Sequence, residues 1–140
     1  MRISSYAVAR PAYYDRNAAS VTAEYVGTVG PHAGTNRFTY TVASGKKLVT
    51  EFAYSSMYRA TVAAPVGQYS AIVFAQVGAN TPRFAYIDSV KNTVDATQQT
   101  TTTGAVTIYA GESLNGYTSD ASTGGTVSYI LQSKGTLFDA

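Results

Sequence analysis

The sequence predicts an all-β fold: an antiparallel β-sandwich, a jelly roll of about eight strands with an N-terminal arm. Short runs in which apolar and polar residues alternate have the two-residue period of half-buried strands. Gly, Pro and Asn interrupt these runs at the spacing that is typical of sandwiches and barrels of Greek-key type. No stretch has a convincing helical pattern, and the sequence contains no repeat of fixed period.

A length of 140 residues indicates one domain, which can bury roughly two thirds of the surface of its unfolded chain. We expect a jelly-roll domain over residues 20–140 and an arm, or a segment that covers a sheet edge, over residues 1–19. The arm contains Tyr and Arg, which dominate contact energies at interfaces. Its expected partner-binding residues are Tyr6, Arg10, Tyr13, Tyr14 and Arg16. The open alternative is that Tyr13 and Tyr14 pack across an open sheet end of their own domain.

The first strand is expected over residues 20–26, followed by a loop over residues 27–36 that is rich in Gly and contains Pro. Strands over residues 37–42 and 46–55 are expected to form a hairpin around Ser44 and Gly45. In the first strand Val21, Ala23 and Tyr25 share one face. The side chains expected to face the core in the next two strands are those of Phe38, Tyr40, Val42, Leu48, Phe52 and Tyr54.

A short strand is expected over residues 58–64. Residues 69–77 are apolar on both faces, which predicts a central strand or one whose outer face is covered. A further strand is expected over residues 83–90. The Thr-rich residues 93–103 have high strand propensity and predict an exposed or edge strand.

The C-terminal residues 104–140 predict two strands that close one sheet, with the polar loop NGYTSDASTGG between them. In the first strand Ile108 and Tyr109 fall on opposite faces. In the second strand Val127, Tyr129 and Leu131 share one face.

Charged residues make up only 13% of the chain, about half of the usual share in soluble domains, so the surface tolerates being covered by a partner. The net charge of +2 comes from charges that are scattered singly, whereas nucleic-acid binding needs a basic stripe. We therefore expect no nucleic-acid partner. No apolar run is long enough for a signal peptide or a membrane span, so we expect a protein made in a cytoplasm, with no membrane partner.

Residues for catalysis or metal binding are sparse. The chain has no Cys and a single His, whereas zinc sites need several such ligands, and His32 is expected to be an exposed loop residue. Asp120 is the one carboxylate in the loop at residues 115–122, which is few for a tight calcium site. Nothing in the sequence selects a pair of acids for glycoside hydrolysis. We therefore expect no enzyme activity, no catalytic residue, no metal and no cofactor.

The polar loop at residues 115–122 supports an alternative function, a receptor- or glycan-binding head domain. Asn115, Tyr117, Asp120 and Ser122 combine a ring that can stack on a sugar with groups that recognise hydroxyls. The same residue types are common in turns for backbone reasons, so the ligand-binding and the purely structural interpretation both stay open.

Three segments, FTYTVASGKKL, NTVDA and VTIYAGESLNGYTSDASTGGTVSYILQSKGTLFD, carry a resemblance to known families. Their order of strand and turn signals is similar to that of the small trimeric jelly rolls of tumour-necrosis-factor and complement globular-head type. The length and the Ser, Thr, Tyr, Gly, Ala and Val content resemble phage structural proteins, in particular the capsid cement proteins of Bordetella-type short-tailed phages. The resemblance covers residues 20–140.

The resemblance implies a virion component, a cement or decoration protein on the capsid exterior that binds neighbouring subunits of the major capsid protein. It also implies a homo-oligomer, a dimer for the cement type and a trimer for the complement type. Such a protein needs a large, dry, shape-matched contact and no reactive group. The resemblance therefore implies a structural protein of a bacteriophage capsid, made in the host cytoplasm. For the alternative function it implies the head domain of a phage fibre or spike.

Overall fold

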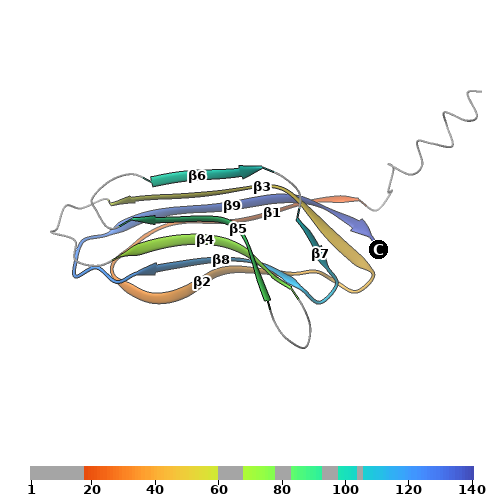
Figure 1. The fold of residues 1–140 in the computed structure, drawn as a ribbon, viewed down its shortest axis with the longest axis horizontal. Coiled ribbons are helices and arrows are strands. Elements are labelled where there is room, and N and C mark those ends of the chain that lie inside the picture. Colours follow the sequence, from red (N-terminus) through yellow and green to blue (C-terminus); the bar gives the residue numbers. More distant parts are fainter. Residues whose placement is uncertain (1–17, 60–67, 78–82, 93–97, 104–105) are drawn as a thin grey trace, which may run out of the picture.

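The computed structural model describes residues 18–59, 68–77, 83–92, 98–103 and 106–140. The predicted arm, apart from its last residues, and most of the strand predicted at residues 58–64 lie outside these ranges. The described residues form nine strands and no helix (Figure 1). The strands are β1 (Ala19–Val29), β2 (His32–Thr41), β3 (Lys46–Arg59), β4 (Tyr69–Val77), β5 (Arg83–Asn92), β6 (Gln98–Thr103), β7 (Thr107–Tyr109), β8 (Ser113–Asp120) and β9 (Val127–Asp139).

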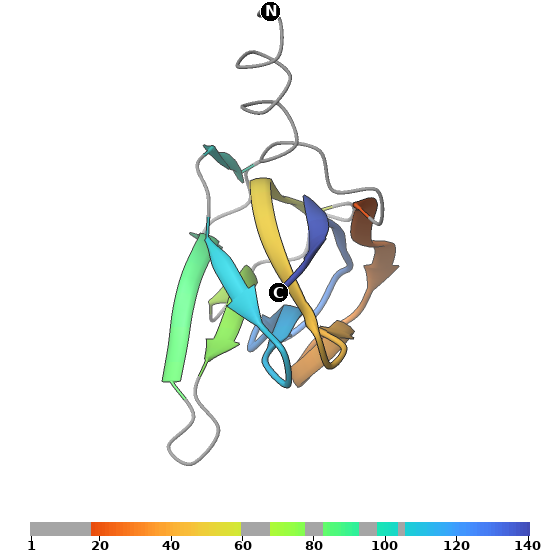
Figure 2. The same cartoon turned by 90° about the vertical axis from the view of Figure 1, so that its right-hand side faces the viewer.

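The strands form two antiparallel sheets that pack face to face. Sheet A has the order β1-β9-β3-β6, with β7 also paired to β3, and sheet B has the order β2-β8-β4-β5. Figure 1 shows β6, β3, β9 and β1 of sheet A above β4, β8 and β2 of sheet B, and Figure 2 looks onto the end of the sandwich where the C-terminus lies. Burial of one face of each sheet against the other gives a sandwich its core.

The strand order is that of a jelly roll. β6 and β7 pair with different parts of β3, β6 with Phe52 to Met57 and β7 with Lys47 to Val49, so together they fill one position in sheet A. Eight positions remain, four in each sheet, and apart from β4 and β5 successive positions alternate between the sheets. The predicted fold class is therefore confirmed.

The core lies between the two sheets and follows the predicted alternation in most strands. Tyr129 and Leu131 of β9 are fully buried, whereas Ile130 between them is 37% exposed. β4 lies between β8 and β5, as expected for a strand with two apolar faces. The side chains that pack in or against this core include Val21, Ala23, Tyr25, Phe38, Tyr40, Val42, Leu48, Met57, Ala71, Val73, Ala75, Ile108 and Leu114.

A β-bulge in β3 overturns part of the predicted core. Thr50 pairs with Gly135 and Phe52 with Lys134, so Glu51 is an extra residue that has no partner in β9. An extra residue reverses the alternation of the residues that follow it. The prediction that Phe52 and Tyr54 face the core is therefore wrong, and the buried residues of β3 after the bulge are Ala53, Ser55, Ser56, Met57 and Arg59.

Two predicted connections are also wrong. The expected hairpin around Gly45 is a crossover, because β2 belongs to sheet B and β3 to sheet A. Gly45 has a φ of +77°, a conformation that glycine adopts without strain. The expected loop at residues 27–36 is mostly strand, since only Gly30 and Pro31 separate β1 from β2. Of the exposed or edge strand predicted at residues 93–103, residues 98–103 form β6, which lies at the edge of sheet A and pairs with β3, whereas residues 93–97 lie outside the described ranges.

Candidate functional site

The predicted ligand-binding loop is a strand. β8 (Ser113–Asp120) lies between β2 and β4 and pairs with both. Strand alternation sends Asn115 and Tyr117 to the outer face of sheet B, whereas Asp120 and Ser122 are buried at one end of the sandwich. The four side chains therefore do not converge on one loop surface, and the predicted boundaries of that loop are wrong.

On the outer face of sheet B, Asn115 is only 3% exposed because neighbouring side chains cover and bind it. Thr39 Oγ1 donates to Asn115 Oδ1 at 2.9 Å, and Asn36 Nδ2 donates to Thr39 Oγ1 at 2.9 Å. The phenol of Tyr117 lies over Gly34, where an added Cβ would be 1.6 Å from the Tyr117 oxygen. The polar side chains of Asn36, Thr39 and Asn115 on this face thus form hydrogen bonds with one another.

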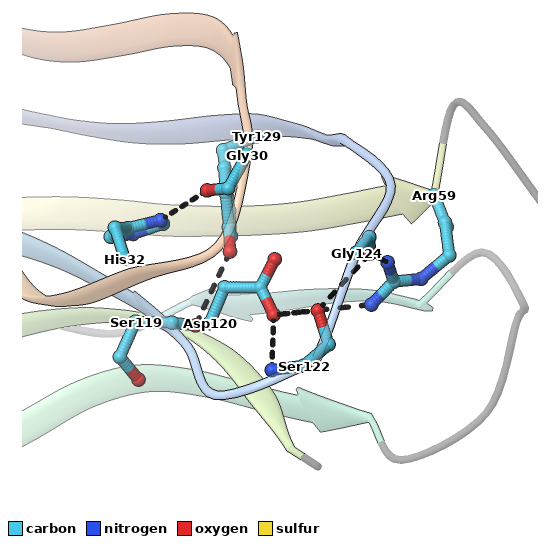
Figure 3. Close-up of polar contacts among 8 residues, drawn as sticks. All are labelled: Gly30, His32, Arg59, Ser119, Asp120, Ser122, Gly124 and Tyr129. Atoms are coloured by element: carbon cyan, nitrogen blue, oxygen red, sulfur yellow. Dashed lines mark hydrogen bonds and ion pairs between the residues drawn. The ribbon is translucent and has the colours of Figure 1, made fainter. Parts of the chain in front are cut away.

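A buried polar cluster, made by Arg59, Asp120, Ser122 and Gly124, lies at the end of the sandwich opposite the C-terminus (Figure 1 and Figure 3). Asp120 Oδ1 accepts hydrogen bonds from the Ser122 backbone nitrogen at 2.9 Å and from the Ser122 hydroxyl. Arg59 Nη1 donates to the Gly124 oxygen at 2.7 Å, and Arg59 Nη2 lies 3.9 Å from Asp120 Oδ1. The Arg59 and Asp120 side chains are 1% and 0% exposed. The guanidinium also lies 4.7 Å from the centre of the Tyr69 ring.

The buried polar cluster joins segments that are far apart in the sequence. Arg59 ends β3, Asp120 ends β8, and Ser122 and Gly124 belong to the connection from β8 to β9. A charge inside a protein is tolerated when it is paired and hydrogen-bonded. The cluster therefore links the β8–β9 connection to the end of β3 in sheet A. Sequence analysis missed Arg59. Simple alternation from Leu48 places Arg59 on the outer face of β3, and only the bulge at Glu51 moves it to the buried face.

A second polar group next to this cluster includes the single histidine. His32 begins β2 and is partly buried, so the expectation of an exposed loop residue is wrong. Its Nδ1 donates to the Gly30 oxygen at 2.9 Å, and its Nε2 contacts Thr118 Oγ1 at 2.9 Å. Arg37 Nε donates to the same hydroxyl at 2.8 Å. These contacts hold the turn between β1 and β2 against sheet B.

Tyr129 lies between these two polar groups. Its ring meets the His32 ring edge to face at 5.8 Å between centres, and its hydroxyl donates to the Ser119 oxygen at 3.2 Å. Burial raises the pKa of the Tyr129 phenol above its ordinary value, and the negative charge of Asp120 raises it further. Tyr129 is therefore a neutral hydrogen-bond donor within the core.

The outer face of sheet A carries an exposed apolar strip, which we define as Val26, Tyr58 and Ile130. These side chains are 63%, 53% and 37% exposed. Val26 pairs directly with Ile130 across β1 and β9, and Tyr58 of β3 pairs with Ser128, two residues from Ile130. Side chains at direct and diagonal positions of neighbouring strands are within reach of each other. The three residues thus form one surface, and contiguous exposed apolar surface is typical of interaction sites.

Tyr6, Arg10, Tyr13, Tyr14 and Arg16 lie outside the described residues. Within the described ranges, no group of three or more His, Cys, Asp or Glu residues could hold a metal ion. No helix in the described part of the chain is long and apolar enough to cross a membrane.

Comparisons with known proteins add little to this description. No family model and no curated protein matches the chain. Among solved structures, the chain is similar to a chain in the structure of infectious bursal disease virus, strain Gx, with a TM-score of 0.47 and 8% sequence identity. The match covers 90% of this chain and 34% of that chain, so this chain spans about a third of the length of the viral chain. The fold is assigned from the strand order of the chain itself.

Proposed function

We propose that this protein is a non-enzymatic viral structural protein that binds the outside of a phage capsid and stabilises contacts between subunits of the major capsid protein. The observation that carries the proposal is the apolar strip on sheet A, three large apolar side chains exposed together on adjacent strands. Removing such side chains from water on binding provides a favourable free energy in proportion to the area buried.

The surroundings of the strip support a protein partner. Ser, Thr and Gln are its neighbours on β1 and β9, and the nearby acid Glu24 already accepts a hydrogen bond from Gln132 at 2.9 Å. Large apolar and aromatic side chains with few free charges are typical of the central part of protein interfaces. A rigid sandwich can present such a surface without ordering a loop on binding, which lowers the entropic cost of association.

The arm is the second proposed contact with the capsid, through Tyr6, Arg10, Tyr13, Tyr14 and Arg16. A contact of this kind adds Tyr and Arg anchors outside the sandwich. Replacing Tyr13 and Tyr14 with Ala is expected to weaken attachment to the capsid more than it weakens folding. Loss of soluble folded protein in the double variant would contradict a partner-binding arm.

The proposal is tested by co-sedimentation of the purified protein with capsids that were assembled without it. The expected result is saturation at a number of copies per major capsid subunit that matches a symmetry position of the lattice. Absence of binding would contradict the proposal.

A matched pair of variants tests the role of the apolar strip in the same assay. Tyr58→Ser removes a strip residue that is 53% exposed, and Tyr109→Ser removes an equally exposed Tyr, at 57%, from β7 outside the strip. Tyr58→Ser is expected to weaken attachment at least tenfold, since hot-spot Tyr residues contribute about 2 kcal/mol or more. Tyr109→Ser is expected to leave attachment nearly unchanged, and equal losses would contradict the strip as the main contact.

A further inference from the structure

The edge strands of the described sheets differ in how they are protected against pairing with another chain. β2 has two register shifts against β8, β5 has one against β4, and β6 has only 6 residues. β1 instead pairs with β9 over all of its 11 residues without a shift. A long regular edge presents a row of free backbone donors and acceptors, and proteins usually blunt such edges with bulges, Pro, Lys or a short strand.

The sequence of β1 lacks the usual protective residues as well. ASVTAEYVGTV contains neither Pro nor Lys, and Glu24 is its one charged residue. Within the described strands β1 pairs only with β9. Its second edge is therefore available, in this part of the chain, to an incoming strand.

We propose that this edge of β1 pairs antiparallel with β1 of a second copy of the chain, about a twofold axis at Ala23. An axis at Glu24, the middle of β1, would place two carboxylates opposite each other, which is unfavourable. An axis at Ala23 places Glu24 opposite the hydroxyl of Thr22 in the second copy, and it brings the two small Ala23 side chains together between the sheets. Residues 19–27 pair in this register.

The pairing has a consequence for attachment. A twofold axis perpendicular to sheet A turns the outer faces of both copies to the same side. The two apolar strips then lie on one continuous surface, and two linked contacts bind far more tightly than one. The inference deepens the proposed function, on which its role in attachment depends, whereas the pairing itself can be measured without capsids.

A charge at position 22 separates folding from pairing. Thr22 lies opposite the exposed Lys134 in the β1–β9 ladder. Thr22→Glu therefore places opposite charges across the ladder and is compatible with folding. In the proposed dimer the new carboxylate faces Glu24 at two symmetric places. The dimer dissociation constant from sedimentation equilibrium is expected to rise about tenfold. Adding Glu24→Lys is expected to restore it, and Thr41→Glu on the edge strand β2 is the control that should leave it unchanged.

The register is tested by disulfide formation. Because the chain has no native cysteine, any disulfide must form between the introduced residues. A mixture of the Thr22→Cys and Glu24→Cys proteins is expected to cross-link under copper-catalysed air oxidation, because these positions face each other across the axis. Each variant alone is expected to cross-link much less.

Three results would overturn the inference: a monomer at all concentrations, a Thr22→Glu dimer as tight as the wild type, or cross-links in the separate variants but not in the mixture. A strand of another protein, or the chain's own arm, on this edge would give the first result. A monomer that still co-sediments with capsids overturns the pairing alone. A dimer that fails to co-sediment overturns the proposed function alone.

Discussion

The buried polar cluster and the apolar strip reverse the usual distribution of residues. Arg59 and Asp120 are charged and almost fully buried, whereas Val26 and Tyr58 are large, apolar or aromatic, and more than half exposed. A buried charge depends on its partners for its stability, so the cluster is coupled to folding. An exposed apolar side chain contributes little to folding, and its free energy becomes available when a partner covers it. The cluster should therefore control stability and the strip should control binding.

The largest expected effect comes from breaking the buried polar cluster. Asp120→Ala removes the carboxylate that accepts two hydrogen bonds from Ser122 and lies beside Arg59. The free energy of unfolding is expected to fall by about 3–5 kcal/mol, measured by chemical denaturation. Asp120→Asn keeps an acceptor for Ser122 and should lose less. A loss below about 1 kcal/mol in Asp120→Ala would contradict a stabilising role.

The second largest effect is expected on binding, from a substitution in the apolar strip. Ile130→Lys places a charge in the centre of the apolar strip and is expected to weaken attachment to capsids by about 2 kcal/mol, roughly thirtyfold. Its free energy of unfolding should change by less than about 1 kcal/mol, because the side chain is 37% exposed. Thr41→Lys adds the same charge to the exposed edge of sheet B and should leave both quantities unchanged. A large loss of stability in Ile130→Lys would show that the two regions are not independent.

A smaller effect concerns Tyr129, beside the buried polar cluster. Tyr129→Phe removes the hydrogen bond to Ser119 and is expected to cost about 1 kcal/mol of unfolding free energy near neutral pH. Burial raises the pKa of the phenol in the folded state above the unfolded value near 10. The unfolded state therefore loses this proton first as the pH rises above about 10, and the contribution of the phenol to stability declines.

The pH dependence is checked by urea denaturation of both proteins at several pH values up to 11. The difference between wild type and Tyr129→Phe is expected to be constant below about pH 10 and to shrink above it. A difference that grows above pH 10 would contradict a buried, neutral phenol.

The smallest effect tests the polar network on sheet B. Thr39→Val removes the donor to Asn115 but keeps the shape of the side chain. Because Thr39 is exposed and water can replace it, the free energy of unfolding is expected to fall by only about 0.5–1 kcal/mol. The result is read from the same denaturation curves as for Asp120→Ala. A loss as large as that of Asp120→Ala would remove the distinction between a buried and a surface network.

By itself the sequence determined the strand character of the chain and most of its inward faces. Alternation is a local property, since successive side chains of any strand point to opposite sides. It therefore identifies Tyr129 and Leu131 as one face of β9, and the two apolar faces of residues 69–77 as those of a central strand. The fold class followed from the number of such runs and from the turn residues between them.

Only the tertiary structure decided which strands pair and which polar residues meet. The bulge at Glu51 depends on how β3 fits the register of β9, and it sends Phe52 outward and Arg59 inward. β8 is a strand in spite of its turn-like composition, because β2 and β4 satisfy its backbone groups from both sides. Pairing between distant segments is set by the packing of two sheets, and a pattern of neighbouring residues contains no information about it. The contact between Arg59 and Asp120, and the apolar strip across β1, β9 and β3, exist for that reason only in the folded molecule.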